Sequence, residues 1–226
     1  MSDRRAVLLD ALGTLLELEP PAARLRAELA SRLDAHVSLA QAQAAVGAEI
    51  AYYRAHLDEG RDPAALVSLR RRCAEVLVEA LPRGVRELVP AGDGIVELLL
   101  ASLRFRPFAD ALGALPRLRE RGALLVVVSN WDVSLHEVLE RIGLAPYLDG
   151  VVTSAEVGAR KPDPAIFERA LGLAGVPASV ALHVGDTLAE DVAGAQNAGI
   201  EPVLIVRDGG AASDRVRTIR SLAELV

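Results

Sequence analysis

Short, unbroken runs of apolar residues recur along this chain, and they constrain its fold more than any other feature. The runs occupy residues 6–9, 123–128, 180–184 and 202–206. Apolar runs of this length are typical of strands that are buried on both faces of a sheet. Between the last three runs lie helix-start signals, such as Asp163 before Pro164, and a helix-stop glycine, Gly199. Because strands and helices alternate, the sequence predicts an α/β fold with a parallel sheet.

An all-helical block interrupts this alternation. It contains no strand-like run, and its apolar residues recur at helical spacing. One such series is Leu25, Leu29 and Leu33. We therefore expect a helical domain over residues 17–103, inserted after the first strand of a core domain that comprises residues 1–16 and 104–226.

Composition excludes several classes of protein. The chain has 226 residues, of which 51% are hydrophobic, and a formal net charge of -6. This apolar content is too high for a disordered chain, and the acidic balance gives no electrostatic footprint for nucleic acid or for an anionic membrane surface. No apolar segment reaches the ~20 residues that a bilayer-spanning helix needs. The single cysteine, Cys73, excludes an internal disulfide and a multi-cysteine metal site, so we expect a cytoplasmic protein.

Polar residues follow the predicted strands at the points where the strands end. Asp10 follows the first run, Ser129 and Asn130 follow the second, and Asp186 follows the third. Lys161 lies on a loop after a shorter apolar run. Each residue alone has a structural explanation as a turn, a cap or a solvated charge. Because the carboxyl ends of parallel strands meet at one edge of a sheet, we expect the side chains of Asp10, Ser129, Lys161 and Asp186 to converge there.

The chemistry of this set suits the transfer of a phosphoryl group. It supplies a carboxylate nucleophile, a hydroxyl, an amide, a fixed cation and a second carboxylate. Phosphoryl transfer requires that negative charge be neutralised and that the attacking group be held in line. Mg²⁺ binds hard oxygen ligands and needs few of them from protein, so two carboxylates and one backbone carbonyl are sufficient.

These residues resemble the motifs of the haloacid dehalogenase (HAD) superfamily of hydrolases, in the branch with a helical cap inserted after the first motif. The matching segments are 10–15 (DALGTL), 128–130 (VSN), 160–163 (RKPD) and 185–191 (GDTLAED). The resemblance covers nearly the whole chain. It implies a Rossmann-like core with a parallel sheet, an all-helical cap domain, a Mg²⁺ ion and a small phosphorylated metabolite as the substrate.

The resemblance also implies roles for individual residues. Asp10 would be the nucleophile that becomes an aspartyl phosphate. Ser129 and Lys161 would hold the transferring phosphoryl group, and Asn130 would join them in phosphate binding by supporting the same loop. Ser129, Asn130 and Lys161 would thus form the phosphate-binding part of the site, and Asp10, Ser129 and Lys161 its catalytic part.

The implied metal ligands are Asp10, the backbone carbonyl of Leu12 and Asp186, with Asp191 behind them to orient water or Lys161. One position departs from the family pattern. Family phosphatases usually carry a second aspartate at the position of Leu12, where it acts as general acid and then as general base. Acid and base assistance is worth ~10²–10⁴-fold, so Leu12 predicts weak activity or a substrate whose leaving group needs no proton.

Two other functions remain open. Dehalogenases of the superfamily also lack the second aspartate and attack carbon without a metal, which makes a 2-haloacid dehalogenase-like hydrolase one alternative. Their fourth motif usually loses its Gly-Asp pair, whereas Gly185 and Asp186 are present here. The other alternative is a non-catalytic regulatory protein that binds phosphate and metal, with Leu12 as its signature. The intact acidic motif favours metal-dependent phosphoryl chemistry.

Two residues near these motifs have structural explanations. His183 lies within an apolar run and is interpreted as a core residue rather than a ligand. Trp131 follows Asn130 and either lines the pocket or packs at its rim. The sequence specifies neither the substrate nor the oligomeric state.

Overall fold

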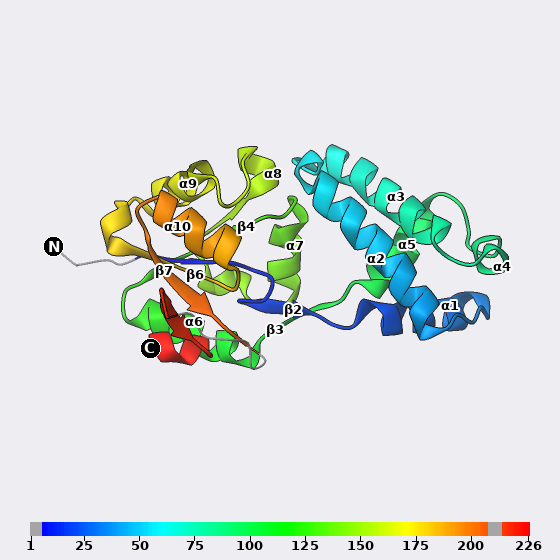
Figure 1. Cartoon of the computed structure of the whole chain (residues 1–226), viewed down its shortest axis with the longest axis horizontal. Coiled ribbons are helices and arrows are strands. Elements are labelled where there is room, and N and C mark those ends of the chain that lie inside the picture. The colour runs from blue at the N-terminus through cyan, green and yellow to red at the C-terminus, as the bar shows by residue number, and fades with distance from the viewer. Residues whose placement is uncertain (1–5, 208–213) are drawn as a thin grey trace. The chain divides into compact units, whose positions relative to one another are not determined.

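The structure, a computed structural model, describes residues 6–207 and 214–226. The chain divides into two compact units. One unit comprises the N-terminal segment up to Glu17 together with Arg106–Val226, and the other comprises Leu18–Phe105. Figure 1 labels the α-helices and several of the strands.

Six of the described strands form a parallel sheet in the first unit, in the order β5-β4-β1-β6-β7-β8. They are β1 (Ala6–Leu9), β4 (Leu124–Ser129), β5 (Gly150–Thr153), β6 (Ala181–Gly185), β7 (Glu201–Ile205) and β8 (Arg217–Ile219). The central strand β1 is buried along its whole length, with Leu9 opposite both Val127 and Val184. The predicted α/β fold with a parallel sheet is confirmed.

Helices cover both faces of this sheet (Figure 1), with α9 and α10 on one face and α6 on the other. The helices are α6 (Ala109–Glu120), α7 (Ser134–Arg141), α8 (Ser154–Val157), α9 (Pro164–Ala174) and α10 (Ala193–Asn197). A π-helical turn spans Leu188–Val192, and 3₁₀ turns span Ala145–Tyr147, Ala178–Val180 and Leu222–Leu225. Ile166 and Phe167 of α9 pack with Leu8 and Val126 of the sheet, and this apolar contact fixes α9 against the central strands.

The second unit is built from helices around its own apolar core. They are α1 (Pro21–Leu33), α2 (Leu39–His56), α3 (Pro63–Glu79), α4 (Arg83–Arg86) and α5 (Asp93–Ser102), with a 3₁₀ turn at Leu57–Glu59. Leu25 and Leu29 of α1 pack with Leu69 and Leu77 of α3 in that core. Within residues 6–207 and 214–226, no helix combines the length and apolar character that crossing a bilayer requires.

Two strands of three residues, β2 (Leu16–Leu18) and β3 (Phe105–Pro107), pair with each other. The sequence did not predict them, because three residues are too few to give an apolar run or a period. Their pairing joins distant parts of the chain, and an ion pair of 3.0 Å between Glu17 and Arg106 links the two strands. These strands lie where the chain passes from one unit to the other.

Glu49 of α2 is a carboxyl group inside the helical unit, with 3% of its surface exposed. Burial raises its pKa to about 7, and a hydrogen bond from the Cys73 thiol opposes part of this shift. An exposed glutamate has a pKa of about 4.5. Between these two pH values the folded chain holds a proton that the unfolded chain has released.

We expect the stability of the helical unit to fall as the pH rises from about 4.5 to about 7, by on the order of 3 kcal/mol from Glu49 alone. Replacing the carboxyl group by an amide, Glu49→Gln, should remove this part of the pH dependence. Urea unfolding at pH 5 and pH 8 measures the effect. Glu75→Gln, an exposed position on α3, is the matched control. Equal pH dependence in wild type and Glu49→Gln would contradict the expectation.

Candidate active site

The polar residues that follow the predicted strands meet at the carboxyl edge of the parallel sheet. Asp10 comes directly after β1, Ser129 is the last residue of β4, and Asp186 comes directly after β6. The register places the ends of these three strands side by side, and the backbone amide of Asp10 donates a hydrogen bond of 2.9 Å to the Val184 carbonyl. The parallel register of the strands therefore fixes the distances between the backbones of these residues, independently of their side-chain contacts.

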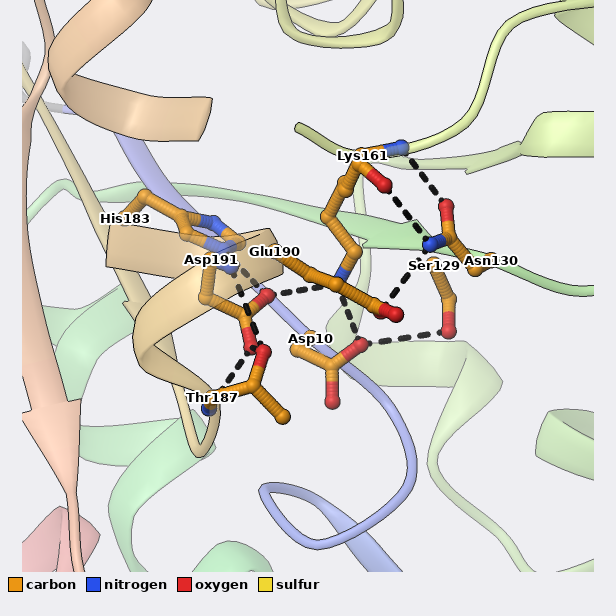
Figure 2. Close-up of polar contacts among 8 residues, drawn as sticks. All are labelled: Asp10, Ser129, Asn130, Lys161, His183, Thr187, Glu190 and Asp191. Carbon is orange, nitrogen blue, oxygen red and sulfur yellow. Dashed lines mark hydrogen bonds and ion pairs between the residues drawn. The ribbon is translucent and has the colours of Figure 1, made fainter. Parts of the chain in front are cut away.

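Asp10 is held by two donors on one of its oxygens (Figure 2). Its Oδ1 accepts hydrogen bonds from Lys161 Nζ at 2.6 Å and from Ser129 Oγ at 3.2 Å. All three residues are buried. The other oxygen, Oδ2, is engaged by neither Lys161 nor Ser129.

The Lys161 ammonium lies between two carboxylates, because its Nζ also donates to Asp191 Oδ1 at 2.6 Å. Only 1% of this side chain is exposed. Burial alone would favour the neutral amine, but the charges of Asp10 and Asp191 outweigh it and raise the pKa of Lys161 above its usual range. Lys161 is thus a fixed cation that contacts the group expected to attack.

Asn130 holds the backbone of the loop that carries Lys161. Its Oδ1 accepts from the Lys161 amide at 2.8 Å, and its Nδ2 donates to the Lys161 carbonyl at 3.1 Å. The same Nδ2 donates to Glu190 Oε2 at 3.0 Å. Both polar atoms of the Asn130 side chain are therefore bonded to protein groups, and Glu190 joins the site as a residue that the sequence analysis did not single out.

Asp191 collects hydrogen bonds on both of its oxygens. Oδ1 accepts from Lys161 and lies 2.9 Å from His183 Nε2, and Oδ2 accepts from the Thr187 amide at 3.0 Å and the Thr187 hydroxyl at 2.6 Å. Burial disfavours the charge, but the Lys161 ammonium and the His183 hydrogen bond outweigh it and hold the pKa of Asp191 well below its usual range. Asp191 is therefore a permanent anion behind Lys161.

His183 has a polar partner as well as an apolar environment. It is buried in β6 with its ring edge-on to Phe167, and its Nε2 contacts Asp191. The sequence pattern showed only a histidine in an apolar run, because the contact joins a strand to the π-helical turn that follows it. The core interpretation of His183 is accordingly incomplete.

Three carboxylates gather where the predicted metal site lies. Asp10, Asp186 and Asp191 each place one oxygen within 4.8 Å of the others. Burial raises the pKa of Asp10 and of Asp186 to about 6, and neighbouring carboxylates add to both shifts. Crowded, buried oxygen ligands whose charges repel one another are the chemistry that Mg²⁺ binds and neutralises. The donor set fits this ion.

Two glycines allow the carboxylates to come this close. A Cβ atom on Gly13 would lie 2.1 Å from Asp186 Oδ2, and a Cβ atom on Gly185 would lie 2.1 Å from Asp191 Cγ. Gly13 also has a φ of 86°, which side chains rarely allow. Leu12, directly before Gly13, is 38% exposed, and its side chain can neither donate nor accept a proton.

Comparison with known proteins identifies the family of sequences that this chain resembles. A family model described as haloacid dehalogenase-like hydrolase matches residues 4–199. The chain is 38% identical over 118 residues to haloacid dehalogenase-like hydrolase domain-containing protein 3 of Mus musculus, which covers 52% of this chain and 47% of that protein. It is 40% identical over 101 residues to a glyceraldehyde 3-phosphate phosphatase of Methanothermobacter thermautotrophicus, covering 44% and 45%. The alignments thus span about half the length of these curated relatives.

Solved structures of two kinds of hydrolase share the fold. A HAD phosphatase from Thermococcus onnurineus has a TM-score of 0.63 at 26% identity, covering 98% of this chain and 95% of the other. A 2-haloacid dehalogenase from Pseudomonas syringae pv. Tomato DC3000 has a TM-score of 0.67 at 26% identity, covering 98% and 96%. Because the fold accommodates both reactions, the chemistry depends on the residues of the site.

The Lys161 charge is directly testable, because Lys161 is the only lysine among the 25 lysine and arginine residues of the chain. Labelling with nitrogen-15 lysine therefore gives one side-chain NMR signal. We expect this signal to remain that of an ammonium group beyond the ordinary lysine pKa of ~10.4, because two carboxylates hold the proton. Asp191→Asn removes one of them and should lower the pKa. Titration at or below the ordinary value in wild type would contradict this expectation.

Proposed function

The chain belongs to the haloacid dehalogenase-like hydrolase family, and from that premise we propose that it is a Mg²⁺-dependent phosphatase acting on a small phosphorylated metabolite. One observation carries the proposal: the buried Lys161 ammonium and two further carboxylates, Asp186 and Asp191, converge on Asp10. Relatives named glyceraldehyde 3-phosphate phosphatase and ribulose-1,5-bisphosphate 5-phosphatase support a substrate of this class. We further propose a cytoplasmic location, which is supported by Cys73 being the only cysteine of the sequence, so that no disulfide forms within the chain.

The contacts of Asp10 support its role as the nucleophile. Lys161 and Ser129 both bond Oδ1, which leaves Oδ2 for attack on phosphorus. The new Oδ2–P bond forms as the bond from phosphorus to the leaving oxygen breaks, and the leaving group departs with the electron pair. Water then attacks the phosphorus of the aspartyl phosphate, which releases phosphate and restores the Asp10 carboxylate.

Other groups stabilise the charge that moves during this exchange. The Lys161 ammonium and the Ser129 hydroxyl point at Asp10 and would bond the phosphoryl oxygens. Asn130 would keep Lys161 in place through the backbone of its loop. Asp10, Asp186 and the Leu12 carbonyl would hold Mg²⁺, with Asp191 behind them. When bound, the ion would neutralise negative charge on the phosphoryl group.

A dehalogenase is the second candidate, and Leu12 is the observation that favours it. A dehalogenase needs no general acid at this position, because a halide leaves as an anion without a proton. The acidic cluster argues against this reaction, since a carboxylate nucleophile that attacks carbon without a metal gains nothing from neighbouring Asp186 and Asp191 oxygens. A non-catalytic phosphate-binding and metal-binding protein is the remaining candidate.

A panel of substrates separates the three candidates. We expect hydrolysis of phosphate esters and acyl phosphates that requires Mg²⁺ and stops with EDTA, and no release of halide from 2-haloacids. Asp10→Asn should abolish the hydrolysis, because an amide is neither a nucleophile of this kind nor an anionic ligand. Halide release that persists in EDTA would identify a dehalogenase. Phosphate and Mg²⁺ binding without turnover of any substrate would identify a binding protein.

Leu12 should limit the rate wherever the leaving group needs a proton. We expect Leu12→Asp to raise the hydrolysis of an alkyl phosphate toward ~10²-fold, and that of an acyl phosphate by less, because an acyl leaving group departs as a stable anion. Leu12→Asn is the matched control, because asparagine has the size and polarity of aspartate but no acid-base function. Rates measured over a series of leaving groups test the idea, and equal slopes in wild type and Leu12→Asp would contradict it.

A further inference from the structure

Arg207, two residues after β7 ends, binds the loop that follows Asp10. Its Nε donates to the Gly13 carbonyl at 3.1 Å, and its Nη2 donates to the Thr14 carbonyl at 2.5 Å. Its Nη1 lies 3.1 Å from both oxygens of Asp110, and the guanidinium carbon lies 3.6 Å from the centre of the Phe108 ring. Each of the three guanidinium nitrogens thus has an acceptor, and the side chain is 15% exposed.

The far side of this contact is itself anchored. Asp110 lies in the first turn of α6, and one of its oxygens also accepts from the Ser221 hydroxyl at 2.9 Å and from the Leu222 amide at 2.8 Å. Asp110 therefore joins α6 to the C-terminal 3₁₀ turn and holds Arg207 in one orientation. An arginine fixed at one end by a rigid carboxylate can define the position of the carbonyls at its other end.

The hydrogen bonds of the loop after Asp10 engage the backbone carbonyls on either side of Leu12. Ala11 O accepts from the Leu15 and Leu16 amides, and Leu16 O accepts from the Gly13 amide. Arg207 donates hydrogen bonds to the carbonyls of Gly13 and Thr14, the two residues after Leu12. In the part of the chain that the structure describes, no donor hydrogen-bonds to the carbonyl of Leu12.

The position of Gly13 connects this loop to the acidic cluster. Gly13 follows the Leu12 carbonyl in the chain, and it packs so closely on Asp186 that a Cβ atom would meet the carboxylate. Loss of the Arg207 contact would let Gly13 move, and movement of Gly13 would change both the orientation of the Leu12 carbonyl before it and the space around Asp186. The Arg207 contact and the Asp186 contact hold the same glycine from two sides.

We propose that Arg207, anchored by Asp110, is a positioning residue that aims the Leu12 carbonyl at the metal-binding carboxylates. The proposal rests on the proposed Mg²⁺-dependent function, because the aim of the carbonyl matters only if it binds the ion. Mg²⁺ demands near-ideal octahedral geometry at ~2.1 Å, so a small displacement of one ligand weakens binding. Groups that orient metal ligands typically contribute 10–100-fold in affinity or activity.

The key variant is Arg207→Lys. A lysine keeps the positive charge above Phe108, but one ammonium cannot reproduce the planar fork that reaches two carbonyls and a carboxylate. The matched control is Arg119→Lys. Arg119 of α6 also donates to a backbone carbonyl, that of Tyr147 at 3.0 Å, and to a carboxylate, Asp149 at 2.9 Å, but none of these residues belongs to the site.

Three measurements on the full chain test the proposal. Hydrogen exchange of the Gly13 and Leu16 amides without metal should rise roughly tenfold in Arg207→Lys and stay unchanged in Arg119→Lys. The Kd for Mg²⁺ from calorimetry should rise by roughly tenfold or more, as expected for a group that orients a metal ligand. With a phosphate ester at saturating Mg²⁺, KM should change little while kcat falls.

The outcomes separate this proposal from the proposed function. Loop exchange and Mg²⁺ affinity that match the Arg119→Lys control, with equal losses of Tm in both variants, would reduce Arg207 to a structural contact and overturn the positioning role. Wild-type protein that neither binds Mg²⁺ nor hydrolyses phosphate esters would instead overturn the proposed function. Asp110→Asn, which loosens the anchor while it keeps an acceptor for the Leu222 amide, should show the same changes as Arg207→Lys in smaller measure.

Discussion

The ion pairs of the buried Lys161 ammonium with Asp10 and Asp191 are the interactions on which the rest of the site depends. Without this cation, two buried carboxylates would lose their only neighbouring ammonium and protonate or separate, because an unpaired buried charge is strongly unfavourable. The chain otherwise uses arginine for its strong bases and keeps one lysine here. The compact ammonium of Lys161 can donate to one oxygen of Asp10 and one of Asp191 within a small space. A planar guanidinium would need a larger space.

Much of this arrangement could be predicted from the sequence, because strands buried on both faces leave a strong apolar signal. The runs at 6–9, 123–128, 180–184 and 202–206 correspond to β1, β4, β6 and β7 within a residue or two. Once those strands are parallel, the residues after them must share an edge, and the approximate place of Asp10, Ser129 and Asp186 follows. The sequence thus predicts which residues form the site and at which edge of the sheet they lie.

The contacts that orient these residues could not be predicted, because they join polar groups whose local patterns are ordinary. His183 sits in an apolar run, and Arg207 is one of many arginines. Only the folded chain brings His183 to Asp191 and Arg207 to Gly13. The sequence does carry one further signal. A single lysine in a chain rich in arginine indicates a position at which the side chain of arginine does not fit.

The balance of charge distinguishes the reactions that this fold supports. Asp10, Asp186 and Asp191 face one ammonium, and the carboxylate of Glu190 adds to the negative charge acting on Asp186. A substrate anion, whether a phosphate or a haloacid carboxylate, would meet repulsion from this excess. A divalent cation would offset most of this excess and would supply an attractive site for phosphoryl oxygens, which bind such ions well. A dehalogenase has no such cation to offset the carboxylates. The acidic cluster therefore suits phosphoryl transfer, whereas in an attack on carbon its charge would repel the substrate. Under the proposed function, Leu12 would alter how a leaving group is protonated, while the carboxylates around it would determine which atom Asp10 attacks.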